Sequence, residues 1–158
     1  MKILVLYDSK YGNTQQVARE IAEQLPGEID LKLVGEFDPQ EVSDYQLVIM
    51  GSPTHGADAT DSFKSFFEQL KSEHLQDVQF GVFDTRVTWW FLKLFGYAAP
   101  RMAHRIRSLG GTVIGEPAGF IVSGGEGPLA EGELERGQRW ALDLQKTAAE
   151  TFKPETRI

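Results

Sequence analysis

Residues 3–14 read Ile3-Leu4-Val5-Leu6-Tyr7-Asp8-Ser9-Lys10-Tyr11-Gly12-Asn13-Thr14, an unbroken apolar run followed by a short polar loop. An apolar run without alternation is typical of a parallel strand that is covered on both faces. The next segment, 14–25, places apolar residues at the spacing of one helix face and stops at Pro26-Gly27. This stretch therefore predicts a strand, a loop and a helix, which together form the first unit of an α/β domain.

The same alternation continues along the chain. Further strands are expected at 29–34, 47–50, 78–83 and 118–122, the last after a short piece at 112–114. Helices are expected near Pro39 and over 63–70, 100–109 and 131–150. We interpret residues 1–158 as one three-layer α/β domain with a five-stranded parallel sheet and helices on both faces. In such sheets ligands bind at the carboxyl ends of the strands, so the loops after the first, third and fourth strands form the candidate site.

The composition restricts the chemistry. The chain has no cysteine, which excludes disulfides, thiol catalysis and cysteine-ligated clusters, so redox chemistry would need a bound cofactor. The formal charge of −7 argues against nucleic-acid binding. It favours a partner with a basic docking face, or serves only solubility. The first apolar run is too short for a signal peptide or a membrane span, so we expect a cytoplasmic protein.

The loop after the first predicted strand has the features of an anion site. It leads directly into a helix, whose first turn offers free backbone N–H groups and a partial positive charge. Gly12 lets the backbone wrap closely, and Ser9, Asn13 and Thr14 add short polar side chains. The alternative is simple capping of the helix by Asn13 or Thr14.

Two loops carry a resemblance to a known family. The run from Ser9 to Thr14 resembles the phosphate-binding loop of the flavodoxin family, and residues 51–58 are similar to the loop that lines the flavin ring there. The resemblance implies a sheet order of 2-1-3-4-5 and one non-covalently bound FMN. It implies that the phosphate is surrounded by Ser9, Lys10, Tyr11, Gly12, Asn13 and Thr14. It implies that the ring is lined by Pro53, Thr54, His55, Gly56 and Ala57.

Within the second loop, two residues have particular expected roles. His55 stands where the family often has tryptophan, and an imidazole offers less area against a ring. The resemblance implies that a carbonyl at Gly56 turns toward N5 of the reduced flavin, which requires a residue that tolerates positive φ.

The third loop is expected to begin at Asp84-Thr85-Arg86, where the family binds the pyrimidine edge of the flavin. By resemblance, Asp84 meets N3 and the carbonyl edge. Arg86 either stabilises negative charge on the reduced ring or pairs with an acidic neighbour. Trp89 is expected to stack on the outer face of the ring.

The segment Trp89-Trp90-Phe91-Leu92-Lys93-Leu94-Phe95 is unusually apolar for such a loop. One interpretation is that it packs inside the domain. The other is that it forms a docking patch for a redox partner, a second subunit or a membrane surface.

The resemblance implies an electron carrier that cycles its flavin through one-electron steps and exchanges electrons with redox partner proteins. A fold this widely reused leaves rivals open. One is an FMN-dependent oxidoreductase with an apolar substrate, such as a quinone reductase or a protoporphyrinogen-oxidase-like dehydrogenase. Another is a flavin-binding interaction module. The three histidines, His55, His74 and His104, are not at metal-ligand spacing, so no metal is expected.

Overall fold

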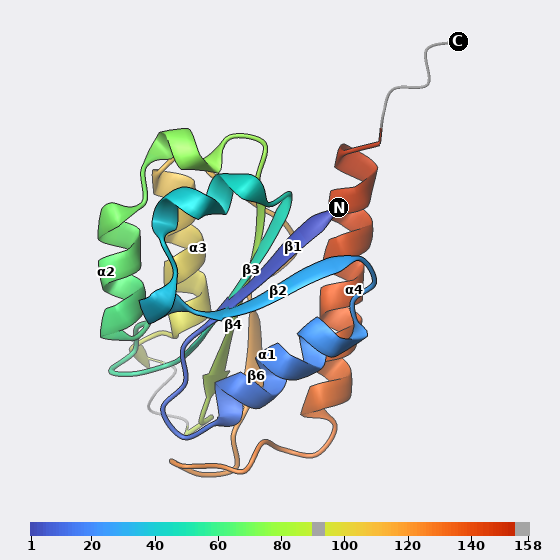
Figure 1. Ribbon diagram of the computed structural model, residues 1–158. Helices are drawn as coiled ribbons and strands as arrows, with labels where there is room; N and C mark the ends of the chain where they lie inside the picture. Colours follow the sequence, from blue (N-terminus) through green and yellow to red (C-terminus); the bar gives the residue numbers. More distant parts are fainter. Residues whose placement is uncertain (90–93, 154–158) are drawn as a thin grey trace.

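The structure is a computed structural model that describes residues 1–89 and 94–153 (Figure 1). The parallel strands are β1 (Lys2–Tyr7), β2 (Glu28–Leu33), β3 (Leu47–Pro53), β4 (Gln79–Arg86), β5 (Thr112–Val113) and β6 (Ala118–Ile121). The α-helices are α1 (Asn13–Gln24), α2 (Asp61–Gln69), α3 (Ala98–Ser108) and α4 (Glu133–Thr151). Short 3-10 helices are η1 (Val34–Glu36), η2 (Pro39–Asp44) and η3 (Ser72–Leu75).

The sheet confirms the predicted order. Its strands follow β2-β1-β3-β4-β5, every pairing is parallel, and β6 also pairs with β4. The short piece expected at 112–114 and the strand expected at 118–122 both form, as β5 and β6, and together they make an interrupted fifth strand along β4. Pro117 lies in the break, where it has no N–H to donate to β4. Leu144 of α4 fills the space over the break, because a Cβ added at Gly81 or at Gly115 would collide with its side chain.

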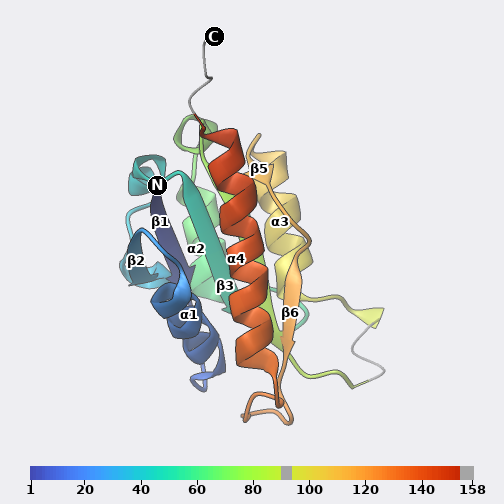
Figure 2. The ribbon, with the colours of Figure 1, turned by 90° about the vertical axis from the view of Figure 1, so that its right-hand side faces the viewer.

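Two helical layers enclose the sheet, as predicted. Figure 2 shows α1 and α4 on the side opposite α2 and α3. Successive residues of β1 face opposite layers: Ile3 and Val5 pack with the α1 and α4 cluster, and Leu4 and Leu6 pack with the α2 and α3 cluster. All four side chains are fully buried. This explains why the strand is apolar throughout and does not alternate.

Several boundaries differ from the predicted ones. β3 runs through Pro53 and β4 runs through Arg86, so Asp84, Thr85 and Arg86 end a strand and do not begin a loop. The strand continues through polar residues because β4 has a partner on both sides, with Asp84 opposite Ser52 of β3 and Gly119 of β6. α3 starts before Pro100, since proline is tolerated in the first turn of a helix.

The carboxyl end of β3 is closely packed. The ring of Phe83 occupies the space that a side chain at Gly51 would need. That ring packs edge-on against Phe120 at 5.7 Å and Trp140 at 5.8 Å between centroids. Phe83, Phe120 and Trp140 therefore form an aromatic cluster that packs against the carboxyl-terminal part of β3.

Candidate functional site

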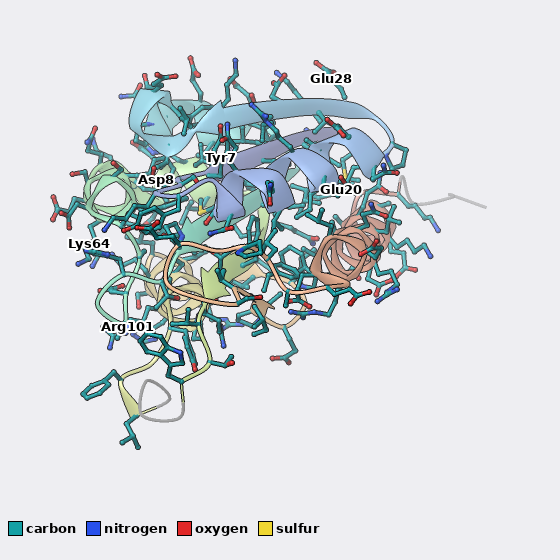
Figure 3. All side chains as sticks on the ribbon, turned by 90° about the horizontal axis from the view of Figure 1, so that it is seen from below. Tyr7, Asp8, Glu20, Glu28, Lys64 and Arg101 are labelled. Atoms are coloured by element: carbon teal, nitrogen blue, oxygen red, sulfur yellow. The ribbon has the colours of Figure 1, made fainter. Side chains whose placement is uncertain are left out.

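Two adjoining cavities open at the carboxyl ends of β1, β3 and β4. Figure 3 views this end of the molecule, with Tyr7 and Asp8 labelled where β1 ends. The first cavity has a volume of about 420 Å³ and the second about 390 Å³. Thr54, Arg86 and Val87 line both cavities. Together they lie in the size range of a small-molecule site.

The loop at the start of α1 presents backbone donors to the first cavity. Gly12 is the N-cap, with a left-handed φ of 92°, and no side chain caps the helix. The predicted alternative, capping by Asn13 or Thr14, is therefore wrong. Within the part of the chain that the structure describes, the N–H groups of Lys10, Tyr11, Asn13 and Thr14 donate no hydrogen bond. A helix N-terminus with such donors suits an anion.

The polar side chains of this loop fasten it to its neighbours. Ser9 Oγ accepts a hydrogen bond from Gly12 N at 3.0 Å. Asn13 Nδ2 donates to the carbonyl of Glu126 at 3.1 Å. The hydroxyls of Thr14 and Thr85 are hydrogen-bonded at 2.8 Å, and both residues are buried. The side chains thus shape the loop, while the backbone supplies the donors.

The loop after β3 is a closed two-residue turn. His55 N donates to Asp58 O at 2.7 Å, and Asp58 N donates to His55 O at 3.1 Å. Between them Gly56 and Ala57 both have positive φ, at 55° and 64°. This is the pattern of a type I′ turn, which is strained at an alanine. Gly56 and Ala57 line the second cavity, while His55 lines the first and is exposed.

Arg86 lies where the two cavities meet. Its Nε donates to Asp84 Oδ1 at 2.6 Å and its Nη2 donates to Asp84 Oδ2 at 2.7 Å. The guanidinium carbon lies 3.7 Å from the ring centroid of Tyr97. On a further side the backbone of Gly119 approaches so closely that a Cβ there would collide with the guanidinium. Of the two interpretations of Arg86, the structure therefore shows the pairing with an acidic neighbour.

Asp84 supports this arrangement from below. Its side chain is fully buried and also accepts a hydrogen bond from Ala99 N, at the start of α3, at 2.9 Å. Burial raises the pKa of Asp84 above its ordinary value and outweighs the opposing effect of Arg86 and of the hydrogen bonds from Ala99 and Thr54. Asp84 lines neither cavity and instead holds Arg86, which lines both, so its contact with a flavin edge stays a prediction.

The structure brings most of the predicted site residues together. The first cavity is lined by Ser9, Lys10, Tyr11, Asn13, Thr14, Pro53, Thr54, His55, Thr85 and Arg86. Gly56 and Ala57 line the second, and Gly12 forms the cap between strand and helix. Trp89, like Asp84, lines neither cavity. Within the described residues, no group of three or more acidic, histidine or cysteine side chains is placed to hold a metal ion.

Other lining residues were not anticipated. Phe95, Gly96 and Tyr97 line the second cavity, although they follow β4 by nine or more positions. Val122 and Gly125 line the first, after the split fifth strand. Val122 and Gly125 could have been found from the sequence, because the glycine pair at 124–125 follows a predicted strand and so lies at the same edge of the sheet as the other site loops.

The apolar segment after β4 is exposed where it is described. Trp89, Leu94 and Phe95 are 54%, 79% and 60% exposed. The interpretation that the segment packs inside the domain is wrong for these three residues, and residues 90–93 lie outside the described part.

Comparisons with known proteins agree with this geometry. The sequence model of the flavodoxin family matches residues 5–140. The fold is similar to that of a flavodoxin from the domain Archaea, with 18% identity, a TM-score of 0.79 and coverage of 94% of this chain and 99% of that one. It is similar to oxidised flavodoxin 2 from Bacillus cereus, with 23% identity, a TM-score of 0.76 and coverage of 96% and 100%.

The fold also recurs as part of a longer protein. It is similar to rubredoxin oxygen:oxidoreductase from Desulfovibrio gigas, with 19% identity, a TM-score of 0.77 and coverage of 97% of this chain and 37% of that one. The family match spans both loops that shape the first cavity, and the sheet order is the one that the family resemblance implied. The chain therefore belongs to the flavodoxin family.

Proposed function

We propose that the chain binds one FMN and transfers electrons one at a time between redox partner proteins. The observation that carries the proposal is the set of backbone N–H groups at the start of α1 that donate no hydrogen bond within the described residues. They lie beside the second cavity, which is lined by Thr54, Gly56, Ala57, Arg86 and Tyr97 among others. An FMN has an anionic end and a planar ring, and the two cavities offer a matching pair of environments.

The phosphate would be held mainly by backbone donors. Lys10 is exposed and is the lysine that lines the first cavity, together with the acidic side chains of Asp8 and Asp61. The Asp8 carboxylate is already engaged, because it accepts hydrogen bonds from Ser9 N at 2.9 Å and from Thr60 Oγ1 at 2.6 Å. Neutral N–H donors and the helix dipole therefore have to supply most of the attraction for a phosphate.

The second cavity would enclose the ring. Bound FMN would supply the redox chemistry, which this cysteine-free chain lacks. Thr54, whose N donates to Thr85 O at 2.9 Å, and the turn at 56–57 would cover one side. Arg86 is held rigidly by Asp84, and its Nη1 donates no hydrogen bond within the described residues. The net charge of −7 would disfavour added negative charge on the ring and so separate the two electron additions.

The first test compares the affinities of FMN and riboflavin, which lacks the phosphate. Flavin fluorescence quenching should show FMN binding at least about a hundredfold more tightly, because a few charge-assisted hydrogen bonds are lost without the phosphate. Lys10→Gln should reduce the FMN affinity less than about tenfold if the backbone dominates. Lys32→Gln, at an exposed position on β2, is the matched control. Equal affinities for the two flavins would refute the phosphate assignment.

The second test follows the visible spectrum during stepwise anaerobic reduction of the FMN-loaded protein. Two separate one-electron steps support the carrier. A single concerted two-electron step would contradict it.

One observation favours an oxidoreductase as a second candidate. The second cavity is edged by Phe95, which is 60% exposed, so an apolar acceptor has an apolar approach to the ring position. Rapid steady-state turnover of a quinone, together with concerted reduction, would establish this alternative in place of the carrier.

A further inference from the structure

Large exposed apolar side chains gather at one place on this molecule. Trp89, Leu94 and Phe95 all lie in the connection between β4 and α3, and Leu94 is 79% exposed. In Figure 2 the described chain on either side of residues 90–93 extends outward beyond α3 and β6. Apolar side chains that project together from a surface mark an interaction site.

Cations flank this projection. α3 carries Arg101, Arg105 and Arg107 and no acidic residue. Arg101 Nη2 donates to the carbonyl of Phe95 at 3.0 Å, so its guanidinium lies at the base of the projection. A groove of about 610 Å³ between α2 and α3 is lined by Lys64, Arg101 and Arg105 among others. Figure 3 shows Lys64 and Arg101 on the same side of the molecule as the projecting segment.

Lys64 is balanced by two acidic groups, because it pairs with Asp58 at 3.8 Å and with Asp61 at 3.9 Å. The three arginines of α3 exceed their acidic partners, since Asp58, which pairs with Arg101 at 3.5 Å, is the acidic residue that pairs with one of them among the described residues. The side chains of Lys64 and Arg101 remain about half exposed. Glu68 is the other acidic residue lining the groove. Within residues 1–89 and 94–153, Arg105 makes no ion pair. Positive charge at this place on a chain of net charge −7 makes the charge distribution uneven, and it would orient this surface toward an anionic partner.

We propose that Trp89, Leu94, Phe95, Arg101 and Arg105, here called the α3 surface, bind the face of an anionic lipid bilayer. The apolar side chains would enter the headgroup boundary, and the arginines would meet lipid phosphates and carboxylates. A bilayer fits this surface because Trp89 and Leu94 are exposed and line none of the three cavities described above, Phe95 extends from the rim of the second cavity, and α3 places arginines beside them. Within the described residues no helix has the length and apolar character to cross a bilayer. The proposal does not depend on the cofactor.

The test is co-sedimentation of the full chain, supplied with FMN, with lipid vesicles. One vesicle set is phosphatidylcholine, and the other contains about one third phosphatidylserine. Binding should be confined to the second set and should weaken as salt is raised. Arg101→Gln with Arg105→Gln should weaken the partition coefficient about 25-fold, at about fivefold for each cation. Leu94→Ser with Phe95→Ser should weaken it at least about tenfold.

Matched controls lie elsewhere on the surface. Leu33→Ser, at a residue 38% exposed on β2, and Arg139→Gln, at an exposed residue on α4, should leave vesicle binding unchanged. All variants should keep the urea midpoint of the parent chain. The proposal is overturned if the chain sediments with neither vesicle set. Binding that the two double variants do not weaken also overturns it. Self-association or binding of a soluble acidic protein through the same residues, without vesicle binding, would assign the surface to a protein partner and overturn the bilayer.

Discussion

Replacing Arg86 with methionine should destabilise the fold strongly, and the loss should depend on pH. The substitution keeps much of the aliphatic stem but removes both hydrogen bonds to the fully buried carboxylate of Asp84. Removing one partner of a buried ion pair costs about 3–5 kcal/mol, because the remaining charge is left uncompensated. Loss of the stack on Tyr97 adds roughly 0.5–2 kcal/mol.

The direction of the pH effect follows from the pKa of Asp84. Burial already raises this pKa, and Arg86 opposes the rise, so the pKa goes higher still in the variant. From about pH 4 upward the unfolded chain releases this proton while the folded chain retains it. The unfolded state therefore binds fewer protons, and the stability of Arg86→Met should fall as the pH rises from that point to the folded-state pKa. The stability that the raised pKa of Asp84 contributes is fully present only below the pKa of this carboxyl in the unfolded chain.

Urea unfolding followed by tryptophan fluorescence, at several pH values from about 4 to 8, measures this difference. The double variant Asp84→Asn, Arg86→Met removes both charges and should recover part of the lost stability near neutral pH. It should also lose the added pH dependence. A loss below about 1 kcal/mol near pH 7, with the same pH profile as the parent chain, would refute the argument that this pair is tightly coupled.

Three further predictions concern the same end of the sheet. Gly51→Ala should destabilise by about 1–3 kcal/mol in urea titrations, because a buried ring occupies the space, whereas Gly125→Ala, with nothing within 4 Å, should change little. Ala57→Gly should stabilise by roughly 0.5–1 kcal/mol, since it relieves a left-handed alanine at some entropic cost in the unfolded chain, and a lowered urea midpoint would contradict the turn geometry. Thr14→Val should cost about 1–2 kcal/mol by leaving the Thr85 hydroxyl unpaired, and Thr14→Ser should recover most of that loss in thermal unfolding.

The sequence allowed the parallel strands and the two helical layers to be predicted because the central strands are buried on both faces, whereas the sheet order came from the resemblance to the flavodoxin family. Ile3 to Tyr7 and Leu47 to Met50 are apolar throughout, and the amphipathic segments between them show which face they bury. The loop at 9–14 was located correctly for the same reason, since a strand end followed by a helix start fixes its place.

Side-chain roles within the site were harder to predict. Asp84 and Arg86 have the composition of a polar loop, but ladders on both sides of β4 keep them in the strand. Their bidentate pairing turns Asp84 away from the cavities, and nothing in the local sequence specifies that direction. Tyr97 contacts Arg86 because the chain between β4 and α3 folds back toward the end of β4. The local amino-acid pattern does not determine that course of the chain.

The break in the fifth strand links three positions that are far apart along the chain. Leu144 fits over the missing side chains at Gly81 and Gly115, so the three sites share one fixed volume. Among related sequences this volume should be conserved although the individual residues change. Where position 81 or 115 carries a side chain, position 144 should carry one smaller than leucine. Such coupled variation would mark the interrupted fifth strand in the amino-acid sequences of related chains.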